Sequence, residues 1–192
     1  MGWYELAKVV HFMGLIALFG FFVVYARAGE RLRAASSLAE ARLWLEMLQA
    51  TRGMLPGGAG MFIVSGSVMA ALRWRGPYPF MVVGFVALLV IVAVWAIVGA
   101  RHLRAMHAAV GDAEGPVSLA IARTILDPAP WGTVGALNGA SLGVLFVMTT
   151  KVGWVAAIAT VILASTLVGG IFTLLVRRRR EALTSGRIAV TA

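Results

Sequence analysis

A histidine inside the first long apolar run is the residue whose chemistry stands out in this sequence. His11 lies roughly two turns into the stretch from Leu6 to Tyr25, where an ionisable group is costly and therefore indicates a function. Glu5 and Lys8 precede it at intervals of three, so all three lean toward one side of a helix. A neutral imidazole can bind haem iron, copper or zinc, or relay a proton. The alternative is a histidine that is hydrogen-bonded to a neighbouring helix.

A lysine closes the fourth apolar run, in the segment MTTKVGW that begins at Met148. A lysine at a helix end beside a tryptophan is typical of an interfacial anchor whose charge reaches the headgroups. In the alternative interpretation Lys151 lies near His11 and pairs with a porphyrin propionate or an anionic quinone oxygen. Iron bound at His11 would then take its sixth ligand from Met148, Met13 or Met81, from water, or from a partner chain.

Two further histidines, His102 and His107, follow the third apolar run. Their five-residue separation puts them about 140° apart on a helix, too far round to hold one metal together. Arg101 and Arg104 flank them, so we expect a solvated basic surface. We also expect both at the face of the membrane opposite His11, which argues against one haem held between two histidines of this chain.

Small residues recur every four positions along the fourth run, at Gly135, Gly139 and Gly143. This spacing is typical of a helix face that lets another helix approach closely. Asn138 lies in the same run, where an amide needs an interhelical hydrogen-bond partner. We therefore interpret these four residues as a helix-packing surface. A flat glycine face that admits a porphyrin or quinone ring is the alternative.

The composition excludes several classes of protein. Of 192 residues, 60% are hydrophobic and 13% are charged, against about 45–50% and roughly 25% in soluble domains. This balance excludes a soluble enzyme and a disordered chain. The absence of cysteine excludes disulfides, thiolate metal sites and a cysteine nucleophile. The net charge of +9 does not indicate nucleic-acid binding, because the basic residues fall in short segments between apolar runs.

Five apolar runs are long enough to cross a hydrocarbon core about 30 Å thick. They cover about residues 6–25, 53–72, 78–100, 131–150 and 152–176. The first is too long for a cleaved signal peptide, so we expect a permanent span. Residues 37–48 can form an amphipathic helix that lies at the headgroups or packs under the bundle. The expected fold is all-α: one bundle over residues 1–192 with five transmembrane helices, and a basic cytoplasmic tail over 177–192.

The distribution of basic residues predicts the orientation. Thirteen of the 17 would lie on one side of the membrane: Arg27, Arg31, Arg33, Arg42, Arg52, Arg101, Arg104, Arg123, Arg177, Arg178, Arg179, Arg180 and Arg187. The other side would hold Lys8, Arg73, Arg75 and Lys151. Positive charge stays cytoplasmic, so we expect the N-terminus outside and the C-terminus inside. Aromatic belts would then form outside from Trp3, Tyr4, Trp74, Tyr78 and Trp154, and inside from Tyr25 and Trp131.

The first run resembles the first span of several small bacterial membrane-protein families. The resemblance rests on the segment LAKVVHFMGL from Leu6, on Phe19-Gly20 and on Arg27. The families are the HemJ-type protoporphyrinogen oxidases, the membrane domain of the CopD copper-resistance proteins, and an uncharacterised family of small integral membrane proteins close to both. The MTTKVGW segment resembles a lysine-containing motif near a late span of the third family, which is the most similar in length and number of spans.

The resemblance to the HemJ-type enzymes implies a haem b held by the first-span histidine, which here is His11. A functional lysine is also known there, but Lys151 follows the fourth run rather than lying in the corresponding span, which departs from the oxidase pattern. Copper handling of the CopD type implies additional histidines and methionines at the outer face, and this sequence lacks them.

We therefore expect a small multi-pass protein of the bacterial inner membrane that binds haem b or a porphyrin, or acts with quinone, through His11. One alternative is a non-catalytic accessory or assembly subunit of a larger respiratory or photosynthetic complex, with lipid, other chains or copies of itself as partners. Another is copper or small-solute transport. Five spans without inverted repeats argue against alternating access.

Overall fold

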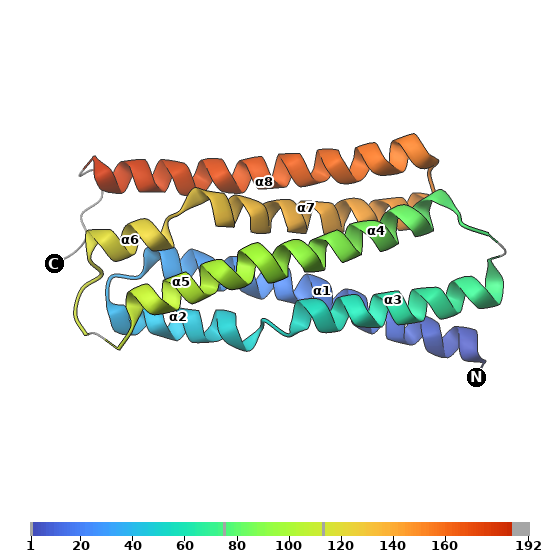
Figure 1. Cartoon of the computed structure of the whole chain (residues 1–192), viewed down its shortest axis with the longest axis horizontal. Helices are drawn as coiled ribbons and strands as arrows, with labels where there is room; N and C mark the ends of the chain where they lie inside the picture. The colour runs from blue at the N-terminus through green and yellow to red at the C-terminus, as the bar shows by residue number, and fades with distance from the viewer. Residues whose placement is uncertain (1, 75, 113, 186–192) are drawn as a thin grey trace.

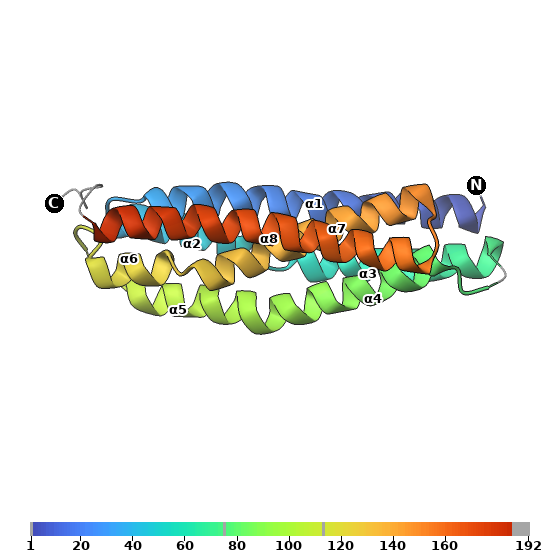
Figure 2. The same cartoon turned by 90° about the horizontal axis from the view of Figure 1, so that it is seen from above.

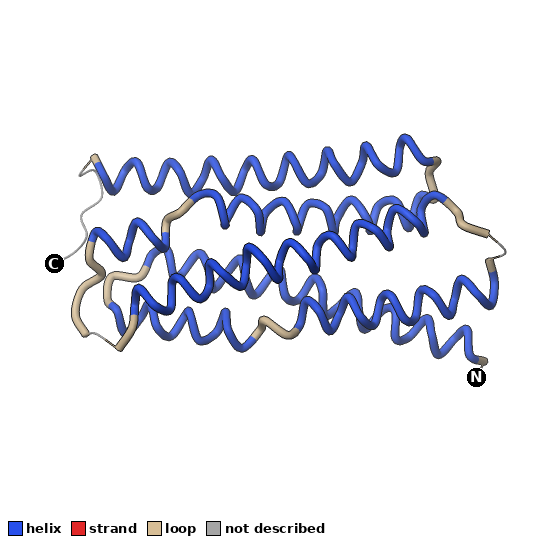
Figure 3. Tube along the Cα trace, viewed as in Figure 1, coloured by secondary structure: helices blue, strands red, loops and turns tan. Residues whose placement is uncertain are grey.

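The computed structural model describes residues 2–74, 76–112 and 114–185, which are almost entirely helical and contain no strand (Figures 1 and 3). Five helical stretches within these ranges are long and apolar enough to cross a membrane, which agrees with the five predicted runs. Arg75 and residues 186–192 of the predicted basic tail lie outside the described residues. The helices are α1 (Trp3–Ala34), α2 (Leu38–Ala50), α3 (Met54–Arg73), α4 (Pro79–Val94), the π-helical turn η1 (Trp95–Gly99), α5 (Ala100–Val110), α6 (Leu119–Ile125), α7 (Pro128–Thr150) and α8 (Trp154–Thr184).

The helices run well past the ends of the apolar runs. The last run was expected to end near Val176, but α8 continues to Thr184, and α1 likewise continues to Ala34. These extensions are rich in alanine, leucine, arginine and glutamate, which are strong helix formers. An ion pair between Arg177 and Glu181, at 2.9 Å, adds i,i+4 support. The bundle is therefore longer than its apolar part.

Side-chain caps mark the residues at which α2 and α7 begin. The Ser37 Oγ accepts a hydrogen bond from the Glu40 N–H at 3.2 Å and begins α2. Asp127 Oδ1 accepts from the Ala129 N–H at 3.2 Å and begins α7, where Pro128 takes the first helical position. The chain therefore turns at positions that its own polar side chains specify.

The amphipathic helix α2 packs against the bundle. Leu38, Ala41, Leu45 and Leu48 lie on one of its faces and are each at most 4% exposed. Burial of this face is favourable by about 25 cal/mol per Å² of apolar surface. The sequence allows this segment either to lie at the headgroups or to pack under the bundle, and the structure shows it packed.

The spans form two close pairs, which the third span links. α1 packs along α3, and α7 packs along α8. α4 contacts α7 while α5 contacts α2, so the third span crosses from one pair to the other (Figure 1). The N-terminus and the α3–α4 and α7–α8 turns lie at one end of the bundle, which we call the N-terminal end. α2, α6 and the last turns of α8 lie at the other, the C-terminal end (Figures 1 and 2).

The main core lies toward the C-terminal end and is aromatic. Tyr25 and Trp131, which the sequence predicts in an interfacial belt, are 0% and 1% exposed and pack at a tilt with their ring centroids 5.7 Å apart. Trp95 of η1 packs on Tyr25 at 5.0 Å, and Gly99 leaves the room that this indole needs. The difference from the expectation has a simple cause. Because the helices extend beyond their apolar runs, positions near the end of a run still lie inside the bundle.

Candidate functional site

His11 is held by three residues of α3. Its Nδ1 lies 3.0 Å from the Oγ of Ser65, which is 3% exposed. The Phe62 ring centroid lies 4.0 Å from that of the imidazole. Gly66 lies beside Cε1, where an added Cβ would come to 3.5 Å. The imidazole is half-buried, so α3 fixes one side of the ring while another stays open.

The hydrogen bonds of Ser65 decide which ring nitrogen of His11 carries the proton. The Ser65 hydroxyl donates its single hydrogen to the Met61 carbonyl of the preceding turn, so toward His11 it accepts. Nδ1 is therefore the protonated nitrogen, and Nε2 carries a lone pair. The Phe62 backbone is a second hydrogen-bond partner of the imidazole, but a carbonyl oxygen cannot pair with a lone pair, so the lone pair of Nε2 has no partner within the described chain.

Two glycines set the register that brings His11 to Ser65. A Cβ at Gly14 would lie 2.9 Å from the Gly58 carbonyl oxygen, and a Cβ at Gly58 would lie 3.0 Å from the Gly14 oxygen. The two backbones can touch only because neither residue has a side chain. Since α1 and α3 are antiparallel neighbours, the turn before Gly14 lies opposite the turns after Gly58, and there His11 meets Ser65.

The two charged residues that precede His11 pair with each other. The Lys8 Nζ lies 2.9 Å from Glu5 Oε2 and 5.7 Å from the centroid of the Tyr4 ring. No hydrogen bond or ion pair joins either of them to the imidazole within the described chain. The three residues share a side of α1 in the sequence, but only His11 is turned to α3.

Met148 and Lys151 lie on the other side of the N-terminal end. Met148 packs onto α4, where its methyl group occupies the space that a side chain at Gly84 would need. Lys151 ends α7 in the left-handed conformation, with φ 54°, and its Nζ lies 5.0 Å from the centroid of the Trp74 ring. None of these contacts involves His11. The roles predicted for Met148 and Lys151 beside a bound cofactor stay predictions.

The glycines of α7 face α8. Gly135, Gly139 and Gly143 each lie where an added Cβ would meet α8, and at Gly139 the Ala164 carbonyl carbon would be only 2.8 Å away. Asn138, in the same turn, is half-buried and has no side-chain hydrogen bond within the described chain. α8 therefore covers the face that was considered as an alternative surface for a flat ring.

Polar groups that the sequence predicts at the inner surface of the membrane are buried at the C-terminal end of the core. His102 is 7% exposed, and its Nε2 has no hydrogen-bond partner among the described residues. The Tyr25 hydroxyl and the Arg33 Nη1 are likewise buried without a partner. All three side chains pack on Trp131, so we call these four residues the Trp131 cluster.

The solvated position expected for His102 is wrong. Ile91, Trp95, His102 and Met106 recur at whole helical turns and are all buried on one stripe, which runs from α4 through η1 into α5. The same stripe was readable in the sequence, but it continues past the apolar run that defined the third span. The arginines that flank His102 are exposed and lie off this stripe, while His107 is half-buried.

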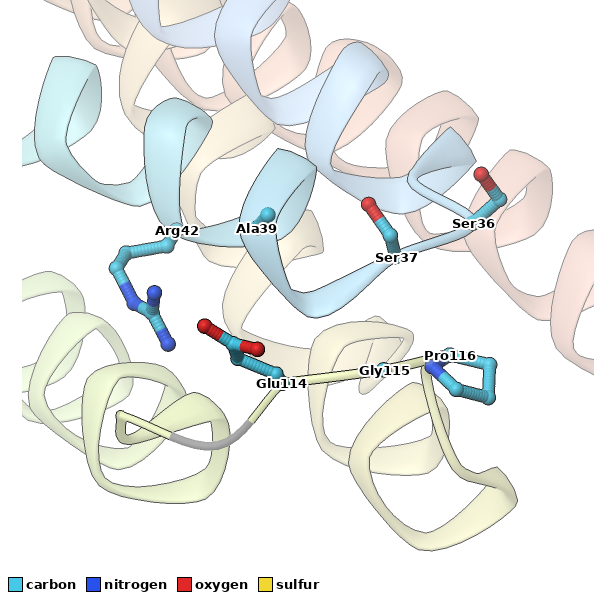
Figure 4. Close-up of a pocket in the computed structure, with 7 residues that line it drawn as sticks. All are labelled: Ser36, Ser37, Ala39, Arg42, Glu114, Gly115 and Pro116. Carbon is cyan, nitrogen blue, oxygen red and sulfur yellow. The ribbon is translucent and has the colours of Figure 1, made fainter.

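A surface hollow of about 510 Å³ lies at the C-terminal end, where two loops meet (Figure 4). Backbone hydrogen bonds join residues 36–38 to residues 115–117 beside it. Arg42 and Glu114 reach into it, and the Arg42 guanidinium donates to the Gly111 carbonyl at 2.9 Å. The hollow is open and its arginine already binds the backbone, so we assign it no ligand.

Among the residues that the structure describes, a bound metal or cofactor would be held by single side chains rather than by a cluster of ligands. Within the described residues, no three His, Cys, Asp or Glu side chains gather as they would around a metal ion. One axial imidazole is sufficient to hold haem iron. Comparisons of the chain with protein-family models, with curated proteins and with solved structures found no match.

Proposed function

We propose that this chain is a multi-pass protein of the bacterial inner membrane that binds haem b or a porphyrin, or acts with a quinol, through His11. One observation carries the proposal. Ser65 accepts the Nδ1–H of His11, which leaves the lone pair of Nε2 without a partner in the described chain. An unused polar atom within an apolar span is costly. Iron and a hydroxyl donor are two groups that such a lone pair can take.

The surroundings of His11 suit a histidine that would hold haem iron. Axial histidines usually donate their second ring N–H to a fixed acceptor, which orients the imidazole and makes the coordinating nitrogen more basic. Ser65 supplies that acceptor, and it is itself fixed by its hydrogen bond to Met61. When bound, haem would supply one-electron redox chemistry. His11 would hold the iron, and Ser65 would orient His11.

The tautomer of His11 also decides whether it can bind the reduced or the oxidised form of a quinone. An unprotonated Nε2 can accept a hydrogen bond from the hydroxyl of a quinol, but it cannot donate one to a quinone carbonyl. A quinol is therefore the form that His11 would bind in the proposed second ligand class.

The basic residues support an orientation with the N-terminus outside and the C-terminus inside. Arginines gather at the end of α1, in α2, α5 and α6, and in the last turns of α8, and these elements share the C-terminal end (Figure 1). Positive segments stay on the cytoplasmic side. In this orientation His11 lies in the periplasmic half of the membrane.

Absorption spectroscopy tests the proposal. Protein that is expressed with a haem precursor and purified in detergent should show a haem b spectrum. His11→Ala should abolish it, while His107→Ala, a half-buried histidine near the opposite end, should keep it. Ser65→Ala should weaken retention of haem by about 10–100-fold, as second-shell variants typically do. Lys151→Ala should weaken it less, because an interfacial charge contact contributes about 1 kcal/mol at most.

A colourless wild-type protein that also retains no quinol would contradict the proposal. The second candidate would then lead, in which the chain is an accessory or assembly subunit of a larger membrane complex. One observation favours that candidate: in the most apolar stretch of α8 only 11% of the residues are buried. Most of this helix is therefore open to lipid or to another chain. An assembly that survives His11→Ala in mild detergent would support the subunit role.

A further inference from the structure

Arg33 packs over a buried indole at the C-terminal end. Its guanidinium carbon is 4.2 Å from the centroid of the Trp131 ring. Trp131 is 1% exposed, and its Nε1 donates to the Ile125 carbonyl at 2.7 Å, so the indole is a fixed platform. Gly29, one turn before Arg33, leaves the space that the indole occupies. The guanidinium is therefore held over the indole by cation–π contact.

Arg33 has no ion pair of its own among the described residues. Glu30, the nearest acidic residue on α1, binds Arg27 at 3.1 Å. Nη1 of Arg33 is buried without a hydrogen-bond partner, but the side chain as a whole is only half-buried. The remaining N–H groups can therefore reach the surface. A cation in this setting favours an anion beside it, because its hydration is incomplete.

A second arginine approaches the same place from α8. The charge of Arg179 repels that of Arg33, and the charge of Glu30, which is paired with Arg27, attracts it. Arg179 is half-buried, whereas Arg177 and Arg178 are exposed. Glu181 binds Arg177 at 2.9 Å and is not paired with Arg179. The guanidinium groups of Arg33 and Arg179 thus come from separate helices and act on each other through their charges, and neither has an ion pair within the described chain.

We propose that Arg33 and Arg179, beside the Trp131 ring, bind a phosphate group, and that its source is the headgroup of an anionic phospholipid. Guanidinium groups bind phosphate oxygens through paired N–H donors, and a stacked guanidinium offers those donors in a fixed direction. The apolar part of α8 ends at Val176, just before Arg179, which is the level at which headgroups meet a spanning helix. Free phosphate offers the same chemistry, so the test separates the two sources.

Thermal unfolding of the full chain in detergent tests the site. Dioleoylphosphatidylglycerol in the micelles, at about 100 times its dissociation constant, should raise the apparent unfolding temperature by roughly 5–10 °C. Equal amounts of dioleoylphosphatidylcholine, and sodium phosphate at matched ionic strength, should raise it much less. An equal shift with sodium phosphate would support the site but overturn the lipid as its source.

Four variants make the test specific. Arg33→Lys keeps the charge but loses the planar fork, and Arg179→Gln loses the second cation, so both should lose most of the shift caused by phosphatidylglycerol. Arg178→Gln, the exposed neighbour, should keep it. Without lipid, Arg179→Gln should unfold at or slightly above the temperature of the parent, because a repelling charge has gone. Arg33→Gln should behave as Arg33→Lys does.

The proposal is overturned if phosphatidylglycerol does not stabilise the parent. It is also overturned if Arg178→Gln loses as much of the shift as Arg179→Gln does. Neither outcome bears on His11, which lies toward the other end of α1.

Discussion

One methyl group added at Gly139 should force α7 away from α8. An added Cβ would lie 2.8 Å from the Ala164 carbonyl carbon and 3.0 Å from the Ser165 Cα, and closer still to the Ala164 oxygen. These are backbone atoms of a helix, so no side chain can rotate away. Ordinary contact would require the two helices to separate by about 1 Å.

The separation has a cost that can be estimated from the contacts it disturbs. Overpacking of a fitted interface costs about 1–3 kcal/mol. The Ser165 hydroxyl also donates to the Ala136 carbonyl of α7 at 3.0 Å, and the loss of one such interhelical bond adds about 0.6 kcal/mol. Alanine favours a helix over glycine by about 0.5–1 kcal/mol, which offsets part of this cost, so we expect Gly139→Ala to lower the free energy of unfolding by about 1–3 kcal/mol. Gly139→Leu should lower it further.

Unfolding in mixed micelles of detergent and sodium dodecyl sulfate, followed by circular dichroism, measures this loss. Gly170→Ala is the matched control, because Gly170 lies in the partner helix and has no atom near an added Cβ. We expect the control to raise the free energy of unfolding by about 0.5–1 kcal/mol, because alanine favours a helix over glycine. Equal stability of Gly139→Ala and Gly170→Ala would show that α7 and α8 do not pack as described.

Three further predictions follow from other parts of the chain. Reporters after α8 should be cytoplasmic and reporters in the α3–α4 turn periplasmic, because the sequence assigns 13 of the 17 basic residues to the side of the C-terminus, and a periplasmic C-terminus would contradict this topology. Gly29→Ala should destabilise the bundle by about 1–3 kcal/mol in the same unfolding assay, because its Cβ would overlap the buried ring of Trp131. Lys151→Gly should stay within about 0.5 kcal/mol of the parent there, since relief of the left-handed backbone offsets the lost cation–π contact with Trp74.

The number of spans could be predicted because an apolar run of about 20 residues has few other uses. The ends of the helices could not be read from the same runs. The segment after Val176 is charged, so hydropathy ends there, but arginine, glutamate and alanine continue a helix without difficulty. The buried position of His102 was missed for the same reason, because the stripe that buries it runs on into a polar segment.

The candidate site could be predicted only in part. The depth of His11 in an apolar run requires a hydrogen-bond partner, but the sequence does not name it. Ser65 becomes the partner because Gly14 and Gly58 bring two backbones into contact in one register. Such a register depends on pairing between residues far apart in the chain. Lys151 was expected on the same half of the membrane as His11, yet its ammonium lies over Trp74, the residue that caps the end of α3.

The protonation pattern of the His11 ring tests the central claim most directly. In protein labelled with ¹⁵N-histidine and kept in detergent, His11→Ala identifies the His11 signals by their disappearance. The described hydrogen bonds predict a protonated Nδ1 and an unprotonated Nε2 in the neutral ring. A proton on Nε2 instead would contradict the account, because His11 would then have no lone pair to offer to iron or to a quinol.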